Sequence, residues 1–337
     1  MLLNTVWFAL VAVLFVGFFF LEGFDYGVGM LLPFLAKEDD QRRAVINAIG
    51  PVWDGNEVWM ITAGGAIFAA FPQWYATLFS GFYLALFLML VALILRGVGF
   101  EFRSKVESPG WRSFWDWMIF LGSFLPALLW GVAVANLVRG VPIGPDMNYR
   151  GSFLTLLNPF GLLGGLAAVT VFLFHGANFL GLKLEEPLAD RARAAARLWA
   201  PIAGILAILF VLGAAGYGLF GRQGGVAARF FALLAALGLL GGWYARVRGR
   251  DGAAFWATGL GVVFAVAMVF SGLYPNVMPS SLDPTYSLTV VNAAASPYTL
   301  RVMTWVAAIF TPLVLLYQGW TYWVFRDRVR VGSGGGY

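Results

Sequence analysis

The feature that most constrains the fold of this chain is a succession of apolar segments that are each long enough to cross a bilayer. About 20 helical residues span the roughly 30 Å of hydrocarbon in a membrane. Nine segments qualify, approximately residues 5–35, 45–71, 75–98, 114–139, 159–182, 197–220, 227–245, 253–274 and 300–326. The composition agrees, since 60% of the 337 residues are hydrophobic and only 12% are charged. We therefore expect an all-α, polytopic integral membrane protein.

The basic residues indicate how these segments are oriented. With nine spans, one side of the membrane receives most of the 22 Lys and Arg residues, namely Lys37, Arg42, Arg43, Arg96, Arg103, Lys105, Arg112, Lys183, Arg191, Arg193, Arg197, Arg246, Arg248, Arg250, Arg326, Arg328 and Arg330. The other side receives Arg139, Arg150, Arg222, Arg229 and Arg301. The positive-inside rule then predicts an N-terminus outside the cell and a C-terminus in the cytoplasm. The net charge of +5 follows from this bias and does not indicate a nucleic-acid partner.

The sequence predicts one transmembrane domain, residues 1–331, followed by a flexible tail at 332–337. The first segment lacks the basic start and the cleavage site of a secretory signal, so we expect it to remain a membrane span. The absence of cysteine excludes disulfides, thiolate metal sites and iron–sulfur clusters.

Two short echoes suggest an internal repeat. The run Glu22–Asp25 (EGFD) resembles His175–Asn178 (HGAN), and Pro51 near the start of one segment is matched by Pro201 near the start of another. The repeat predicts two four-helix bundles and one extra helix, with halves at 1–140 and 159–275 and a terminal helix at 300–326. Chance explains these echoes almost as well.

Acidic residues inside apolar segments are the candidate functional residues, because a charge at membrane depth costs about 2.5 to 3.5 kcal/mol on insertion scales. The first segment carries Glu22 and Asp25 on one helix face. The second carries Asp54 and Glu57 at the same spacing, in the motif IGPVWDGNEVWMIT. We predict that these acids line a cavity or a proton path. The alternatives are a helix-end pair that reaches water and an ion pair with Arg96 that locks helices together.

The remaining polar candidates are interpreted as structural. Arg96, Glu101 and Arg103 fall at the expected cytoplasmic boundary, where snorkelling arginines and a salt bridge are ordinary. Binding of a lipid head group or proton uptake is the alternative. His175 is the only histidine, so it cannot supply bis-histidine haem ligation, and we expect His175 and Asn178 to hydrogen-bond a neighbouring helix. No phosphate loop, dinucleotide fingerprint or hydrolase elbow is present in the sequence.

Several long motifs resemble subunit II of the cytochrome bd quinol oxidases. They extend over nearly the full chain and are LEGFDYGVGMLLPF (Leu21–Phe34), IGPVWDGNEVWMITAGGAIFAAFP (Ile49–Pro72), LFSGFYL (Leu78–Leu84), LRGVGFEFR (Leu95–Arg103), HGANFLGLK (His175–Lys183), YPNVMPSSL (Tyr274–Leu282) and SPYTLRVM (Ser296–Met303). The resemblance implies a subunit of a respiratory enzyme in the bacterial cytoplasmic membrane. That enzyme oxidises membrane quinol, reduces dioxygen to water and generates proton-motive force without pumping.

The resemblance also implies a division of labour between subunits. Two b-type haems and one haem d are held mainly by subunit I, and this chain would lie against that subunit without ligating a cofactor. Membrane lipid and quinol are further expected partners, and some members of the family also hold a quinone or small single-helix accessory subunits.

Site roles can be carried onto individual residues of this sequence. The acidic positions of the family fall on Asp25 and Asp54, and Asp54 is the better candidate for a proton path towards the haems. Trp59 matches a position associated with dioxygen access, and we add the nearby Trp53 as a cavity candidate. Glu57 stands where some members have an uncharged amide, which weakens a relay role for it. The rival hypothesis is a proton-coupled secondary transporter, which would move its substrate as a single chain.

Overall fold

The structure is a computed structural model in which residues 1–332 are described, and most of these residues are helical. The helices are α1 (Leu2–Leu35), α2 (Asp39–Ile49), α3 (Trp53–Ala70), α4 (Pro72–Gly81), α5 (Tyr83–Phe102), α6 (Pro109–Arg139), α7 (Phe153–Leu156), α8 (Pro159–Lys183), α9 (Leu188–Gly216), α10 (Gly225–Val247), α11 (Asp251–Leu273) and α12 (Pro297–Val324). Short 3-10 turns lie at Arg103–Lys105, Leu219–Gly221 and Pro284–Tyr286, and two short strands are β1 (Asn276–Met278) and β2 (Leu288–Thr289). The expected tail at 332–337 lies outside the described residues, apart from Gly332.

Within residues 1–332, eight helices are long and apolar enough to cross a membrane: α1, α5, α6, α8, α9, α10, α11 and α12. The expected span at 45–71 is not one helix, because the chain breaks between Ile49 and Trp53 into α2 and α3. Pro51 lies in this break and has no N–H with which to continue the α2 ladder. The 18-residue α3 carries the acids of the motif and is not among the eight apolar helices.

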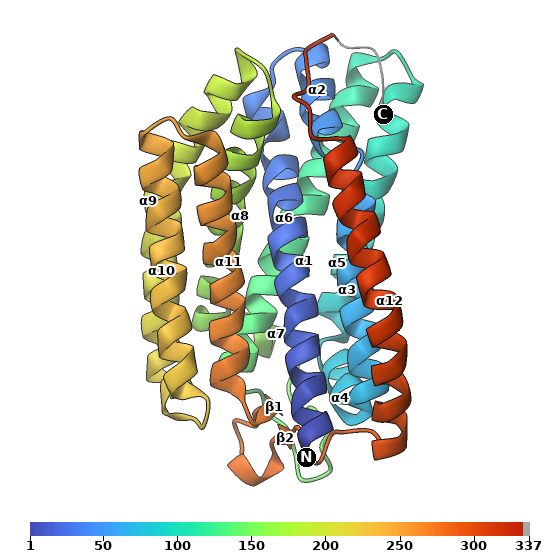
Figure 1. Ribbon diagram of the computed structural model, residues 1–337, viewed down its shortest axis with the longest axis vertical. Coiled ribbons are helices and arrows are strands. Elements are labelled where there is room, and N and C mark those ends of the chain that lie inside the picture. Colours follow the sequence, from blue (N-terminus) through green and yellow to red (C-terminus); the bar gives the residue numbers. More distant parts are fainter. Residues whose placement is uncertain (333–337) are drawn as a thin grey trace.

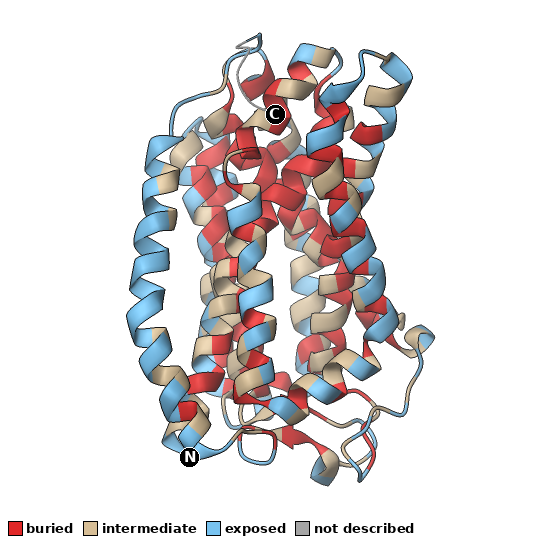
Figure 2. Cartoon of the chain, turned by 90° about the vertical axis from the view of Figure 1, so that its right-hand side faces the viewer, coloured by how far each residue is buried: buried red, intermediate tan, exposed pale blue. Residues whose placement is uncertain are grey.

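The helices run roughly along the long axis of the molecule (Figure 1). The central helix α1 has α3, α5 and α6 on one side and α8 to α11 on the other, while α12 lies at the outer edge beside α3. One hydrophobic core extends through both groups of helices, from Phe18 on α1 to Phe100 on α5 and Phe174 on α8. Figure 2 shows buried residues along the middle of the bundle and exposed residues on its outward faces.

Helices α1 and α8 approach each other closely at two glycines. A Cβ atom on Gly27 would lie 2.0 Å from the carbonyl oxygen of Phe172, and one on Gly176 would lie 2.6 Å from the carbonyl carbon of Gly27. Small residues at such a crossing let two membrane helices pack backbone to backbone. This contact fixes the depth of the two motifs, EGFD and HGAN, relative to each other.

The two ends of the bundle differ in character. The end that carries Lys37, Arg103 and Arg328 is called the basic end here, and the end that carries β1 and β2 is called the opposite end. The long connection after α11 packs over the opposite end, where Asn4 Nδ2 donates to the Val290 carbonyl oxygen at 2.8 Å. The polar connection before the last helix therefore covers this end of the bundle.

Candidate functional site

Three acidic side chains of the first half meet around one arginine in the interior of the bundle. Arg96 of α5 forms an ion pair with Glu22 of α1, and its Nη1 lies 3.9 Å from Glu57 Oε2 on α3. Arg96, Glu22 and Asp25 are fully buried. We call Glu22, Asp25, Glu57 and Arg96 the acid cluster. Arg96 therefore does not snorkel to the membrane surface as expected, because Glu22 holds its guanidinium inside.

The acid cluster contains three carboxyl groups and one guanidinium. Glu22 Oε2 and Asp25 Oδ1 have no hydrogen-bond partner among residues 1–332, and the two residues lie one turn apart on the same face of α1. Such a pair forms a hydrogen bond only when one of its members carries a proton. Since burial of uncompensated charge is costly, this arrangement favours a proton shared between Glu22 and Asp25.

Asp25 is connected to α3 and α12 by a second set of polar contacts. Asn56 Nδ2 donates to Asp25 Oδ2 at 2.7 Å. The Oδ1 atom of Asn56 accepts from the Tyr322 hydroxyl at 2.8 Å and from Gln318 Nε2 at 3.2 Å. The motif IGPVWDGNEVWMIT includes Asn56, but the sequence alone gave no role to Asn56, Gln318 or Tyr322. Helical spacing could have pointed to Asn56. Residues 54 and 56 lie on opposite sides of a helix, so only one of them can face the core.

Asp54 lies apart from the acid cluster. It is exposed and lines a shallow cleft of about 230 Å³ between α3 and α5, together with Trp53 and Glu57. The side chain of Glu57 is 17% exposed and is also paired with Arg96, so it belongs to both the cleft and the cluster. The structure thus brings Glu22, Asp25 and Glu57 together, while Asp54 is exposed and lines the cleft.

The two tryptophans of the motif have different surroundings. Trp53 packs against Phe100, with ring centroids 5.1 Å apart, and lines the cleft. Trp59 donates from Nε1 to Gln318 Oε1 at 2.8 Å. Trp59 is therefore an anchor for α12, a role that the sequence did not indicate.

Glu101 and Arg103 separate at the basic end. Glu101 is exposed, whereas Arg103 is buried and pairs with Asp116 Oδ1 at 2.6 Å and with Asp39 Oδ1 at 2.8 Å. The expected salt bridge is present for Arg103, but it is made with α6 and α2 and does not involve a snorkelling side chain. Arg103 thereby ties three helices together.

His175 makes the helix-to-helix contact that was expected. Its Nε2 forms a 3.1 Å hydrogen bond with the Phe20 carbonyl oxygen, and its ring stacks on Phe255 with centroids 4.9 Å apart. A haem ligand must present a ring nitrogen to an open space that holds the porphyrin. The packing of His175 between α1 and α11 does not fit that requirement. Within residues 1–332, no group of three His, Cys, Asp or Glu residues is placed to hold a metal ion.

Asn178 belongs to a second buried polar group. Its Oδ1 accepts from Arg246 Nε at 2.9 Å, and its Nδ2 donates to Thr258 Oγ1 at 2.8 Å. Arg246 Nη1 also pairs with Asp251 at 2.5 Å, and Asp251 accepts two further bonds from Arg193 at 3.1 and 2.9 Å. We call Asn178, Arg193, Arg246 and Asp251 the arginine cluster.

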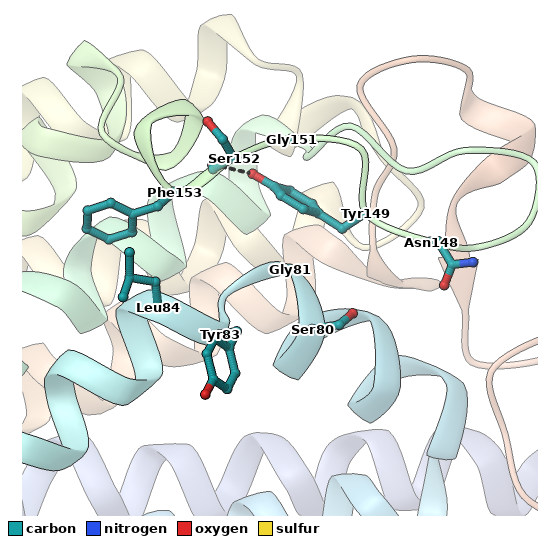
Figure 3. A pocket seen from close by; sticks show the side chains of 9 residues that line it. All are labelled: Ser80, Gly81, Tyr83, Leu84, Asn148, Tyr149, Gly151, Ser152 and Phe153. Atoms are coloured by element: carbon teal, nitrogen blue, oxygen red, sulfur yellow. Dashed lines mark hydrogen bonds between the residues drawn. The ribbon is translucent and has the colours of Figure 1, made fainter.

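A larger hollow, of about 510 Å³, lies at the opposite end of the bundle (Figure 3). Ser80 and Tyr83 line it from α4 and α5, and Tyr149 and Phe153 line it from the loop and helix after α6. The Tyr149 hydroxyl donates to the Ser152 carbonyl oxygen at 3.0 Å, as the dashed line in Figure 3 shows. This hollow is lined by neutral residues, whereas Asp54 and Glu57 line the smaller cleft.

Comparison with known proteins identifies the family. Residues 3–325 match the family model described as cytochrome bd terminal oxidase subunit II. Subunit 2 of the cytochrome bd ubiquinol oxidase of Bacillus subtilis is 44% identical over 328 residues, with 97% of each chain covered. Subunit 2 of the cytochrome bd-I ubiquinol oxidase of Escherichia coli K12 is 42% identical over 366 residues, covering 97% of this chain and 95% of the relative.

A solved structure supports the same fold. A chain of the bd oxidase from Geobacillus thermodenitrificans superposes with a TM-score of 0.78 and 17% identity, covering 97% of this chain and 98% of that chain. The apolar helices, the full-length match and the two relatives lead to one conclusion. This multi-pass membrane protein belongs to the cytochrome bd terminal oxidase subunit II family, and is thus a subunit of a respiratory oxidase.

Proposed function

We propose that this chain is the proton-conducting and structural subunit of a bacterial quinol oxidase whose two b-type haems and haem d are held by subunit I. The observation that carries the proposal is the acid cluster, in which Glu22 and Glu57 pair with the buried Arg96 and the buried Asp25 lies one helical turn from Glu22. Ionisable groups inside a membrane protein are costly and typically mark ion or proton pathways. The helix-to-helix contacts of His175 support the placement of the haems outside this chain.

The proposed route begins at Asp54 and passes through Glu57 to Glu22 and Asp25. Asp54 and Glu57 line one cleft, and Glu57 and Glu22 share Arg96. Protons consumed in dioxygen reduction would come from the basic end, which the positive-inside rule assigns to the cytoplasm. Because the cleft opens on the surface of α3 and α5, these helices would face subunit I.

The proposed topology has nine crossings, with the N-terminus outside. In Figure 1, α1 begins at the opposite end and α12 ends at the basic end, which requires an odd number of crossings. The extra crossing beyond the eight apolar helices is α3, which follows α2. Helix α4 folds back along α3, with the ring centroids of Phe68 and Tyr75 5.0 Å apart, and leads into α5. We retain the division into residues 1–140, 159–275 and 300–326, supported by the α1–α8 crossing at Gly27 and Gly176.

A dioxygen route beside Trp53 remains part of the proposal, since Trp53 lines the apolar part of the cleft. Trp59 is a weaker candidate, because its indole N–H is engaged by Gln318. The outward faces of α9, α10 and α12 carry exposed apolar side chains, among them Leu212, Leu237 and Leu316. These faces suit contact with lipid, a quinone or a single-helix accessory subunit.

The proposed route is tested by Asp54→Asn and Asp54→Glu in the intact complex. The amide cannot carry a proton, so Asp54→Asn should slow dioxygen reduction more than Asp54→Glu. Haem content is measured first, because loss of haem from both variants would indicate an assembly role. Equal and normal turnover in both variants would place Asp54 outside the route.

The subunit role is tested by removing the chain. We expect the haem d absorption to be lost, and full quinol oxidase activity without this chain would contradict the proposal. A proton-coupled transporter would instead bind or move a substrate as a purified single chain. The family assignment favours the oxidase subunit over that alternative.

A further inference from the structure

The polar contacts between α3 and α12 form a chain of hydrogen bonds with a fixed direction. An indole N–H donates and cannot accept. Trp59 Nε1 lies 2.8 Å from Gln318 Oε1, so this amide must present its oxygen to Trp59. Its Nε2 is thereby turned towards Asn56 Oδ1, 3.2 Å away. The donor-only character of Trp59 thus sets the orientation of Gln318.

The orientation of Gln318 in turn sets that of Asn56. The Oδ1 atom of Asn56 accepts from Gln318 Nε2 and from the Tyr322 hydroxyl, which lies 2.8 Å away. With its oxygen engaged by two donors, Asn56 presents Nδ2 to Asp25 Oδ2 at 2.7 Å. An amide can ordinarily turn to suit its partner, but here two donors, Gln318 Nε2 and the Tyr322 hydroxyl, engage its oxygen and leave Nδ2 for Asp25.

We infer that Trp59, Gln318, Tyr322 and Asn56 are positioning residues that keep the proton of Asp25 on the side of Glu22. Because Asn56 always offers a donor to Oδ2, that oxygen is the acceptor and any proton on Asp25 resides on Oδ1. Oδ1 has no partner among residues 1–332, and Glu22, one turn earlier on the same face of α1, is the neighbouring buried carboxyl group.

The ionisable groups that act on Asp25 come from four helices. They are Glu22 on α1, Glu57 on α3, Arg96 on α5 and Tyr322 on α12. The first three belong to the acid cluster, and the hydroxyl of Tyr322 is committed to Asn56. The orientation of Asn56 therefore directs proton transfer from Asp25 towards the acid cluster and away from α12.

Helix α12 has few buried side chains. Within Pro297–Val324, Leu300 is the one buried residue. Hydrogen bonds hold the helix, since Trp7 Nε1 donates to the Leu300 carbonyl oxygen and to Thr304 Oγ1, each at 3.1 Å. A proton on the α12 side of Asp25 would face this exposed helix instead of the acid cluster.

The test uses Gln318→Glu and Gln318→Met in the intact oxidase complex. The new carboxylate in Gln318→Glu accepts from Trp59 and also from Asn56 Nδ2, so the amide of Asn56 turns and offers its oxygen to Asp25. The proton of Asp25 then moves to Oδ2. Gln318→Met removes one donor to Asn56 Oδ1 but adds no acceptor for Nδ2, and the Tyr322 hydroxyl can still donate to Oδ1, so the orientation is kept.

Infrared difference spectra of the carboxyl C=O stretch provide the readout, with Asp25→Asn identifying the Asp25 band. We expect the band to rise in frequency in Gln318→Glu, because its carbonyl oxygen no longer accepts from Asn56, and to stay in place in Gln318→Met. Turnover per haem should fall about tenfold in Gln318→Glu alone. An unmoved band in Gln318→Glu, or no Asp25 band at any pH at which the complex is folded, overturns the inference.

A matched pair on α12 controls for changes in helix packing. Tyr322→Phe removes one of the two donors to Asn56, whereas Tyr317→Phe makes the same substitution at an exposed position of α12. Tyr322→Phe combined with Gln318→Met should move the Asp25 band, and Tyr317→Phe combined with Gln318→Met should not. The same band position in both combinations overturns the inference.

The inference rests on the proposed function only in treating Asp25 as a carrier of protons to the oxidase. The two can fail separately. If Asp25→Asn keeps normal turnover while the band moves as expected in Gln318→Glu, the positioning is correct and the proposed route is wrong. If Asp25→Asn abolishes turnover while the band does not move, the route stands and the positioning is wrong.

Discussion

The two halves of the bundle each bury an arginine, but they balance its charge in different ways. In the acid cluster, the fully buried Arg96 pairs with the buried Glu22 and lies 3.9 Å from the partly exposed Glu57, and the buried Asp25 is one turn from Glu22. In the arginine cluster, Arg246 faces one carboxylate and the amide of Asn178. Asp25 and Asn178 occupy the same place in the echoing motifs EGFD and HGAN. Asp25 has a carboxyl group, which can carry an exchangeable acid proton, whereas Asn178 has an amide, which cannot.

Their positions in the bundle differ as well. Asp251 is 13% exposed and lies at the start of α11, so water and Arg193 both reach it. A pair in that setting loses less hydration on folding than a fully buried pair. The acid cluster of the first half therefore has more carboxyl groups than cations in a buried site, where the desolvation of charge is most unfavourable. The arginine cluster of the second half lies closer to water, where this desolvation penalty is smaller.

The largest expected effect is that of Arg96→Gln. This change leaves Glu22 buried without its cation, and removal of one partner of a buried pair typically costs about 3–5 kcal/mol. We expect loss of the assembled, haem-containing complex, measured as haem per protein after purification. The double variant Arg96→Gln/Glu22→Gln should recover part of the assembly. Normal haem content in the single variant would show that the pair is not needed.

Asp25→Asn makes the first half resemble the second. The amide keeps an oxygen for Asn56 but carries no exchangeable acid proton, so turnover should fall by about 100-fold or more while haem content is retained. Asp25→Glu should retain more activity than Asp25→Asn. Steady-state quinol oxidation normalised to haem is the measurement, and equal activity of the two variants would argue against proton transfer at this position.

Arg246→Met tests the structural character of the arginine cluster. Asp251 would still be paired with Arg193, so we expect a smaller cost than at Arg96, about 1–3 kcal/mol from the polar groups left unpaired. The melting temperature of the complex should drop while turnover per haem stays near that of the wild type. A selective loss of turnover with unchanged melting would assign a functional role to this cluster.

Asn178→Asp is the reverse exchange and should have a smaller effect. The new carboxylate would accept from Arg246 Nε, which already faces Asn178 at 2.9 Å, and its attraction would roughly offset its desolvation. Melting temperature and turnover should both remain close to wild type. A large loss of stability would show that the arginine cluster cannot accept a second acid.

Asp146, at the opposite end, gives the smallest effect and serves as a surface reference. Hydrogen bonds from Asn148 and Arg150 hold the pKa of the Asp146 carboxyl below its usual value of 3.8. Because the pKa of this carboxyl is lower in the folded state than in the unfolded state, the charged carboxylate stabilises the fold at pH values above its usual pKa. This contribution disappears as the pH falls through the lowered pKa. Asp146→Asn should therefore melt slightly lower than wild type near neutral pH and equally in strong acid. A difference that persists in strong acid would contradict this account.

Much of the fold could be predicted from the sequence because hydrophobic length is a local property. The apolar runs gave the ends of α8, α10 and α11 to within a few residues. The expected span at 45–71 was wrong as a single helix, since hydropathy alone does not register the break at Pro51. Hydropathy alone also misses the proposed ninth crossing, because α3 has 18 residues and carries Asp54, Asn56 and Glu57 in its first two turns.

The site was predicted in part. The spacing of Glu22 and Asp25 placed both on one face, and the structure buries both. The same reasoning grouped Asp54 with Glu57, whereas Asp54 is exposed and lines the cleft. Gln318 and Tyr322 were missed because their role depends on contacts with α3, more than 250 positions earlier in the chain.

The sequence by itself determined that this protein is a membrane bundle with acids at membrane depth, because segment length and charge content act locally. Only the tertiary structure decided which acids share Arg96 and which end of Asn56 faces Asp25. Helical spacing fixes the face on which a side chain lies but not the helix that this face meets. The packing of α1, α3, α5 and α12 made that choice, and with it the side of Asp25 from which a proton can leave.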